Sequence, residues 1–191
     1  DKIKQVLFYP EKFFQNLKEK TVEDALLYYT ILLAFNVVMG YLIFLAFGDM
    51  LTRMILNIFN LNIPMPSFNA LTFLGKTILS YIFAIIFSFI IAGILYVWIL
   101  IFGGNKGYVK AYQLFAYSQT PKLLFGWIPF LILFTWIYDL VLIIIGTKKI
   151  YNFSTTKAVL IYIIPLAIIF IISLFVLSFA IFYLRTLNPL V

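Results

Sequence analysis

The chain has 191 residues, of which 64% are hydrophobic and only 11% are charged, so too little polar surface is available to cover a soluble fold and lipid must surround it. Cysteine and histidine are absent, which excludes disulfides, thiol nucleophiles, Ser-His dyads and nearly all transition-metal sites. The formal net charge of +7 is compatible with nucleic-acid binding, but basic cytoplasmic loops give membrane proteins the same balance, and we adopt this second interpretation.

The N-terminal segment, residues 1–24, is predicted to carry a short amphipathic helix at the inner face. It is polar and charged, so we expect no cleavable signal peptide. Pro10 can begin a helix that places Phe13 and Phe14 on one face and charged residues elsewhere. That pattern fits a helix lying on the inner leaflet and equally a helix packed against the protein itself.

Four apolar stretches are long enough to cross the hydrocarbon core, which takes ~20 helical residues. The region 108–146 is ambiguous. It fits one crossing after a surface helix, and it also fits a hairpin of two crossings that turns near Gly126 and Pro129, residues suited to a helix end and a helix start.

Charge asymmetry distinguishes the two arrangements, because cytoplasmic loops are enriched in Lys and Arg. Five crossings place on the inner side Lys2, Lys4, Lys12, Lys18, Lys20, Lys106, Lys110, Lys148, Lys149 and Lys157, and on the outer side only Arg53, Lys76 and Arg185. Four crossings leave nine basic residues inside and five outside. We therefore predict an all-α integral membrane protein, one domain over residues 1–191, with transmembrane helices at about 25–47, 77–102, 109–126, 128–146 and 158–184. Its N-terminus is cytoplasmic and its C-terminus lies outside the cell membrane.

The first outer loop is predicted to contain a second interfacial helix. Met50, Met54 and Ile58 recur at helical spacing, opposite polar residues. We expect the Pro64-Met65-Pro66 turn to end this segment.

The second crossing carries a stripe of small residues, Ser80, Ala84, Ser88 and Ala92. In lipid such a stripe lets another helix approach closely. We expect the approaching helix to belong to the same chain, and a second copy is the alternative. The loop that follows, residues 103–107, is rich in glycine but lacks the full P-loop pattern, so we interpret it as a flexible inner loop rather than a phosphate-binding nest.

Asp139 is the only carboxylate deep within a predicted crossing. A charged Asp there costs ~2.5–3.5 kcal/mol, so it must face protein or water and find a partner. Lys122 is the candidate cation, although its side chain can also extend to the outer interface. A protonated Asp139 would instead donate to Asn36 or Gln119. These four residues form either a proton- or ion-sensitive site or a polar link that fixes helix packing.

Three segments resemble motifs of the Yip-one domain family of small multi-pass membrane proteins. Tyr9-Pro10-Glu11-Lys12-Phe13-Phe14 is similar to the Pro-x-x-Phe-Phe segment that precedes the first span in prokaryotic members. Ala116-Tyr117-Ser118 with Pro121 resembles the Tyr-Ser…Pro signature of the third span. The region 146–158, which contains Gly146, Lys148, Tyr151, Ser154 and Lys157, is similar to the loop between the last two spans.

The resemblance implies about five spans and the short prokaryotic type of the family. Eukaryotic members are associated with Rab-type GTPases, but this chain lacks their Asp-Leu-Tyr-Gly-Pro motif, so Rab binding is not expected. The chain has no nucleophile–base pair beyond Ser118 and Lys122, which lie one helical turn apart, and no cofactor or metal motif. We expect a non-enzymatic membrane-organising or binding scaffold whose partners are the bilayer and anionic lipids or a cytosolic protein, without nucleic acid. The alternative is a small permease or channel that uses Asp139 and requires a homo-oligomer.

Overall fold

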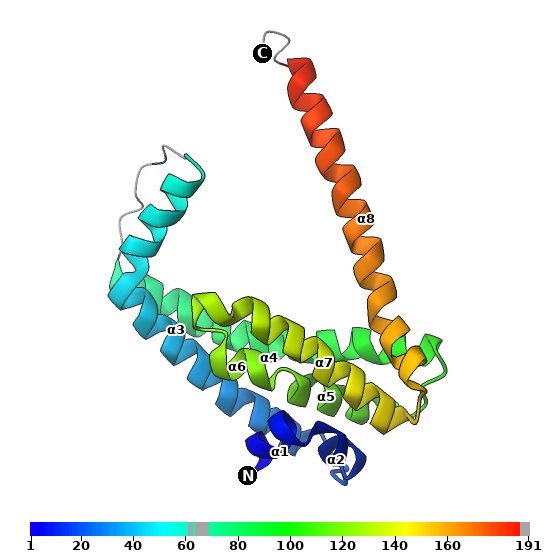
Figure 1. Cartoon of the computed structure of the whole chain (residues 1–191). Coiled ribbons are helices and arrows are strands. Elements are labelled where there is room, and N and C mark those ends of the chain that lie inside the picture. The colour runs from blue at the N-terminus through cyan, green and yellow to red at the C-terminus, as the bar shows by residue number, and fades with distance from the viewer. Residues whose placement is uncertain (61–62, 64–68, 188–191) are drawn as a thin grey trace.

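The computed structural model describes residues 1–60, 63 and 69–187, and all regular elements in these residues are helices (Figure 1). In chain order they are α1 (Lys2–Phe8), α2 (Pro10–Gln15), α3 (Glu23–Ile58), α4 (Ala70–Ile101), α5 (Gly107–Ser118), α6 (Thr120–Phe125), the 3-10 turn η1 (Pro129–Leu131), α7 (Ile132–Tyr151) and α8 (Thr155–Leu187).

Four segments are long and apolar enough to cross a membrane: Glu23–Ile58, Ala70–Ile101, Pro129–Tyr151 and Thr155–Phe179. They expose many large apolar side chains, such as Leu27, Ile94 and Phe175. A soluble protein rarely exposes so much continuous apolar surface, whereas lipid tails solvate it well. The chain is thus an all-helical, multi-pass membrane protein.

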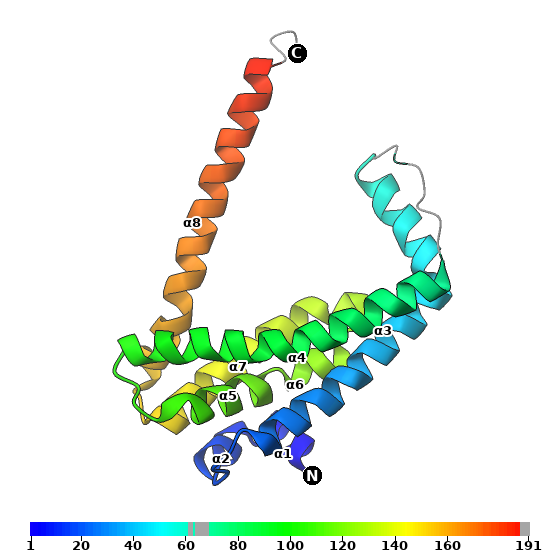
Figure 2. The ribbon, with the colours of Figure 1, turned by 180° about the vertical axis from the view of Figure 1, so that it is seen from behind.

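The region 109–126 is divided into two helices, α5 and α6, which meet at Gln119. Pro121 lies in the first turn of α6, where its ring disfavours a continuous helix through the preceding residues. Every residue from 111 to 118 is buried, and α5 contacts α3, α4 and α7. Together α5 and α6 lead the chain from the end of α4 to the start of α7 at the opposite end of the bundle (Figure 2).

The segment from Met50 to Ile58 continues α3 instead of forming a separate helix. No proline interrupts it, and α3 changes direction near its C-terminal part (Figure 1, cyan). The Thr52 hydroxyl donates to the Gly48 carbonyl at 2.8 Å, a local bond that bends helices. The expected turn at Pro64-Met65-Pro66 lies outside the described residues.

The N-terminal helices α1 and α2 pack against the protein, the second of the two arrangements that the sequence allowed. Val6, Phe13 and Phe14 are buried, and the Tyr138 hydroxyl of α7 donates to the Leu7 carbonyl. Burial of these apolar side chains holds α2 against α7 and α1 against α6.

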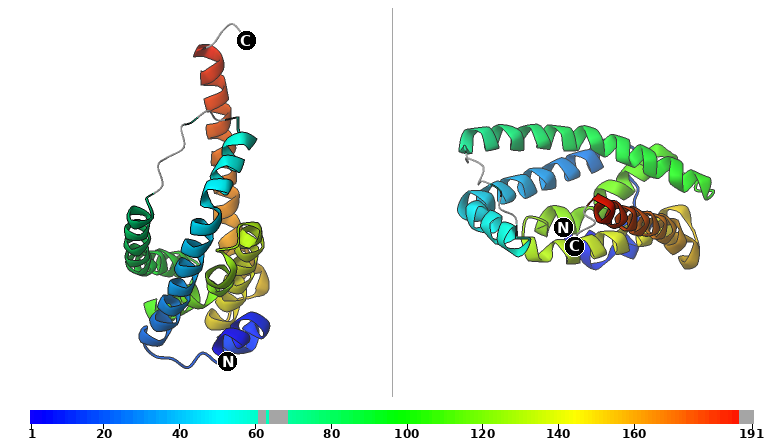
Figure 3. Two further views of the ribbon diagram at one scale, coloured as in Figure 1. Left: turned by 90° about the vertical axis from the view of Figure 1, so that its left-hand side faces the viewer. Right: turned by 90° about the horizontal axis from the view of Figure 1, so that it is seen from above.

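Three segments lie near the end of α7: the N-terminal segment (residues 1–22), which runs from there along α7 to α6, the α4–α5 loop (102–106) and the α7–α8 turn with the first turn of α8 (152–157). We call this the basic end. Gly104 has no room for a side chain, because a Cβ atom there would lie 2.9 Å from the Tyr151 ring. α4 and α7 lie on opposite sides of the bundle (Figure 3). α8 extends away from the basic end.

Candidate functional site

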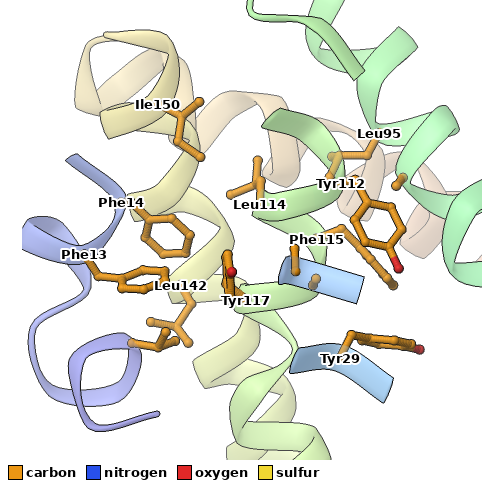
Figure 4. Close-up of a cluster of buried hydrophobic side chains, with 14 of the residues drawn as sticks. Phe13, Phe14, Tyr29, Leu95, Tyr112, Leu114, Phe115, Tyr117, Leu142 and Ile150 are labelled. Atoms are coloured by element: carbon orange, nitrogen blue, oxygen red, sulfur yellow. The ribbon is translucent and has the colours of Figure 1, made fainter. Parts of the chain in front are cut away.

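The three motifs that carry the family resemblance meet in one buried cluster at the basic end (Figure 4). The Phe13 ring stands edge-on to Tyr117, with 4.9 Å between centroids. A Cβ atom on Gly146 would lie 3.1 Å from the Phe14 ring and would overlap the Leu114 side chain. The absence of a side chain at residue 146 therefore lets α2 approach α5 and α7 closely.

A polar network joins the N-terminal segment to α5. The Glu19 carboxylate accepts from Lys2 Nζ at 2.8 Å and from the Tyr117 hydroxyl at 2.6 Å. The Lys110 ammonium donates to the backbone carbonyls of Leu17 and Glu19, both at 2.9 Å, and to the Gln113 side chain. These bonds satisfy the buried polar groups of α5, which lipid could not satisfy.

Sequence reasoning missed this network. Its available signal was the pair Lys110 and Gln113, spaced one helical turn apart in an otherwise aromatic and apolar stretch. Buried ammonium and amide groups need hydrogen-bond acceptors from elsewhere in the chain. The loop at residues 16–22 supplies these acceptors as backbone carbonyls.

The predicted inner-loop residues divide into two groups. Gly146 and Tyr151 are buried; Lys148 is half-buried; Ser154 and Lys157 are exposed. Ser154 Oγ accepts from the Lys157 amide at 3.3 Å, at the start of α8. The Lys157 ammonium lies 4.3 Å from the centroid of the Phe153 ring. Part of this loop thus packs inside the protein, whereas Asn152 and residues 154–157 are exposed.

Lys149 forms an ion pair with Glu11 of α2 at 2.8 Å. The hydrogen bond and the charge of Lys149 hold the pKa of the Glu11 carboxyl below its ordinary value. The pair is well exposed, so its main effect is to orient α2 against the end of α7.

The four predicted intramembrane polar residues come together between α3, α6 and α7. Asp139 is 6% exposed, and its Oδ1 accepts from the backbone amide of Lys122 at 3.2 Å. The Asn36 side chain donates to the Lys122 carbonyl at 3.0 Å. Of the alternatives that the sequence left open, the ion pair between the Lys122 ammonium and Asp139 does not form within the described residues.

The hydrogen bond between the Lys122 amide and Asp139 has a local cause. The helix break at Gln119 and Pro121 leaves the first amides of α6 without their usual carbonyl partners, and Asp139 caps one of them from the neighbouring helix. The second carboxylate oxygen, Oδ2, is buried and has no hydrogen-bond partner in the described part of the chain. Asp139 also lines a cavity of about 330 Å³ whose walls include Gln119, Lys122, Trp136, Tyr162 and Leu166.

About half of the small-residue stripe of α4 packs against other helices of the same chain. Ser88 and Ala92 are fully buried, and Ser88 Oγ lies 3.0 Å from the Tyr112 hydroxyl of α5. Ala84 is half-buried and Ser80 is exposed. The buried half of the stripe thus lets the aromatic side of α5 pack close to α4.

The exposed charge of the basic end is carried by six lysines: Lys4, Lys12, Lys18, Lys20, Lys106 and Lys157. Across residues 1–60, 63 and 69–187 none of these six forms an ion pair. Those same residues contain no group of three acidic side chains suited to a metal.

Comparison with known proteins identifies one family. The family model described as the Yip1 domain, the family indicated by the sequence motifs, matches residues 4–177. This match covers the N-terminal helices, the whole bundle and most of α8. No curated protein and no solved structure matches the chain.

Proposed function

Because the chain belongs to the Yip1 domain family, we propose that it is a non-enzymatic membrane scaffold whose basic end faces the cytoplasm. That end binds the negatively charged surface of an anionic membrane or of a cytosolic protein. The gathering of six exposed lysines without ion pairs at one end of the described chain supports this function above all. Each lysine close to an anionic leaflet contributes ~1 kcal/mol to association.

We further propose five crossings in the cell membrane, with the N-terminus inside and the C-terminus outside. Two observations support the fifth crossing. α5 and α6 have 12 and 6 residues, about 18 Å and about 9 Å of helix, and they lead the chain from one end of the bundle to the other. The Glu11–Lys149 ion pair and the bonds from Lys110 to the N-terminal segment require the ends of α2, α5 and α7 to lie together.

Removing exposed charge from the basic end should weaken its binding to anionic vesicles. We expect the triple variant Lys4→Gln, Lys12→Gln, Lys18→Gln to lose at least tenfold in affinity, because each charge contributes ~1 kcal/mol and about 1.4 kcal/mol is tenfold. The measurement is cosedimentation of nanodisc-embedded protein with phosphatidylserine vesicles, repeated in phosphatidylcholine.

The matched control is the double variant Arg53→Gln, Lys76→Gln, which removes exposed basic side chains at the other end of the bundle. It should bind like the wild type. Added salt should weaken the binding of the wild type more than that of the triple variant. Equal binding by the triple variant and the wild type would refute the proposed role of the basic end.

The unpartnered Oδ2 of Asp139 favours a second candidate, a small permease or channel formed by an oligomer. Buried carboxylate oxygens are nearly always bonded, and intramembrane carboxylates often mark ion or proton pathways. If the protein has this function, the cavity beside Asp139 is an intermediate binding position for a cation or a proton on its way across the membrane.

Two substitutions at Asp139 separate transport from packing. Asp139→Asn keeps an oxygen that accepts from the Lys122 amide, so we expect the melting temperature to stay near that of the wild type. Asp139→Leu leaves that amide unpaired and should lower stability by about 1–3 kcal/mol. Proteoliposome flux that is present in the wild type and absent in Asp139→Asn would establish transport, and absence of flux in both would leave Asp139 with the packing role alone.

A further inference from the structure

A cavity of about 260 Å³ lies at the basic end, between α2, the start of α5 and the end of α7. We propose that it binds the phosphate group of an anionic phospholipid headgroup, an inference that rests on the proposed function of the basic end and gives it a defined site. Three lysines line the cavity, Lys106, Lys110 and Lys149, together with Phe14, Gln15, Leu17, Ile150 and Asn152.

The cavity carries excess positive charge. Lys149 is paired with the Glu11 carboxylate. The Lys110 ammonium is bonded to two backbone carbonyls and to the Gln113 amide oxygen. These bonds use all three of its N–H donors, so Lys110 gives the cavity its positive charge but no free hydrogen-bond donor. Lys106 is exposed and forms no ion pair with the described residues.

A further acid, Glu19, interacts electrostatically with Lys110. Its carboxylate is bonded to Lys2 and to the Tyr117 hydroxyl, so the charge of Lys2 balances it. Lys106 and Lys149 therefore retain N–H donors for a phosphate, while the charge of Lys110, held in place by its three bonds, adds attraction. Such pre-positioning reduces the entropy that binding must otherwise lose.

The chemistry of the walls selects a lipid phosphate. Lysine ammonium groups bind phosphate as point charges, and basic pockets between helices at the cytoplasmic side receive anionic headgroups. The volume is below the ~300–1,000 Å³ of sites for drug-sized ligands, so it suits a headgroup fragment.

Lys106 is the residue on which to test the site, because its exposed side chain forms no hydrogen bond or ion pair with the residues that the structure describes. The test uses the full chain in detergent, with dioctanoyl phosphatidic acid as the anionic probe. Dioctanoyl phosphatidylcholine and inorganic phosphate serve as separate arms. Binding is measured by calorimetry, and the melting temperature reports that each variant is folded.

We expect phosphatidic acid to bind the wild type, with phosphatidylcholine and inorganic phosphate at least tenfold weaker. Lys106→Glu should weaken phosphatidic acid binding at least tenfold. The matched control Lys20→Glu reverses an exposed lysine of the same end outside the cavity and should stay within twofold of the wild type. Gln15→Trp, which fills the cavity without changing its charge, should also abolish binding.

Equal effects of Lys106→Glu and Lys20→Glu would overturn the site and leave a diffuse basic surface. Inorganic phosphate binding as tightly as phosphatidic acid would overturn the lipid assignment. Absence of phosphatidic acid binding in the wild type would overturn the site while the vesicle assay still decides the function of the basic end.

Discussion

Replacing Gly146 with leucine is expected to abolish the folded protein. A single Cβ atom at this position already overlaps Leu114 and lies 3.1 Å from the Phe14 ring. Leu114 is completely buried and Phe14 is 2% exposed, so neither side chain has space to move. Overpacking costs about 1–3 kcal/mol or more, and leucine adds three carbons beyond the Cβ. Size-exclusion chromatography and thermal unfolding in detergent measure the loss.

The chain contains its own control for this experiment. A Cβ atom added to Gly40 on α3 would have no neighbouring atom within 4 Å, so Gly40→Leu adds the same side chain to open apolar surroundings. We expect its stability to stay within about 0.5 kcal/mol of the wild type. If Gly146→Leu elutes and melts like Gly40→Leu, α2 does not pack against α7 as described.

We expect cysteine labelling to show that the two ends of the hairpin formed by α5, α6 and α7 lie on opposite sides of the membrane. One end is the turn between α6 and α7, and the other is where α5 begins and α7 ends. The wild type contains no cysteine, so single cysteines can be labelled without background. Gln15→Cys and Thr156→Cys lie at the basic end and are exposed, so a membrane-impermeant maleimide should reach both from the cytoplasmic side. Trp127→Cys, in the turn between α6 and α7, should react only from the other side.

Sealed vesicles of both orientations provide the measurement, and detergent-opened vesicles show that every cysteine is reactive. The expected difference is all-or-none, because a charged maleimide does not cross the bilayer. Labelling of Thr156→Cys from the side opposite to Gln15→Cys would mean that α5 and α6 do not cross. The four-crossing arrangement would then hold.

The long apolar helices were predictable from the sequence because hydropathy alone specifies them. The break between α5 and α6 at Gln119 was harder to predict from the sequence. α5 contains Gln113 and Ser118 and is not strongly apolar, and only packing by α3, α4, α7 and the N-terminal segment keeps it from lipid. Such burial depends on contacts between distant segments, which periodicity does not report.

The sequence indicated which intramembrane polar residues lie together but not which hydrogen bonds they form. Asn36, Gln119, Lys122 and Asp139 were singled out as polar groups in apolar surroundings, and the structure brings them together. The sequence left open whether Asp139 pairs with the Lys122 ammonium or donates to Asn36 or Gln119, and the backbone amide of Lys122 is the partner that the structure gives it. Pro121 was the signal, because proline near a helix start marks a break with free amides.

The position of the N-terminal segment constrains how the protein is made. Its bonding partners lie far along the chain, at Gln113, Tyr117 and Tyr138, separated from it by 92 to 131 residues. During synthesis Phe14 leaves the ribosome long before Gly146 exists to receive it. The segment must therefore remain undocked until α5 and α7 have been synthesised, so its docking is a late step in the assembly of the bundle.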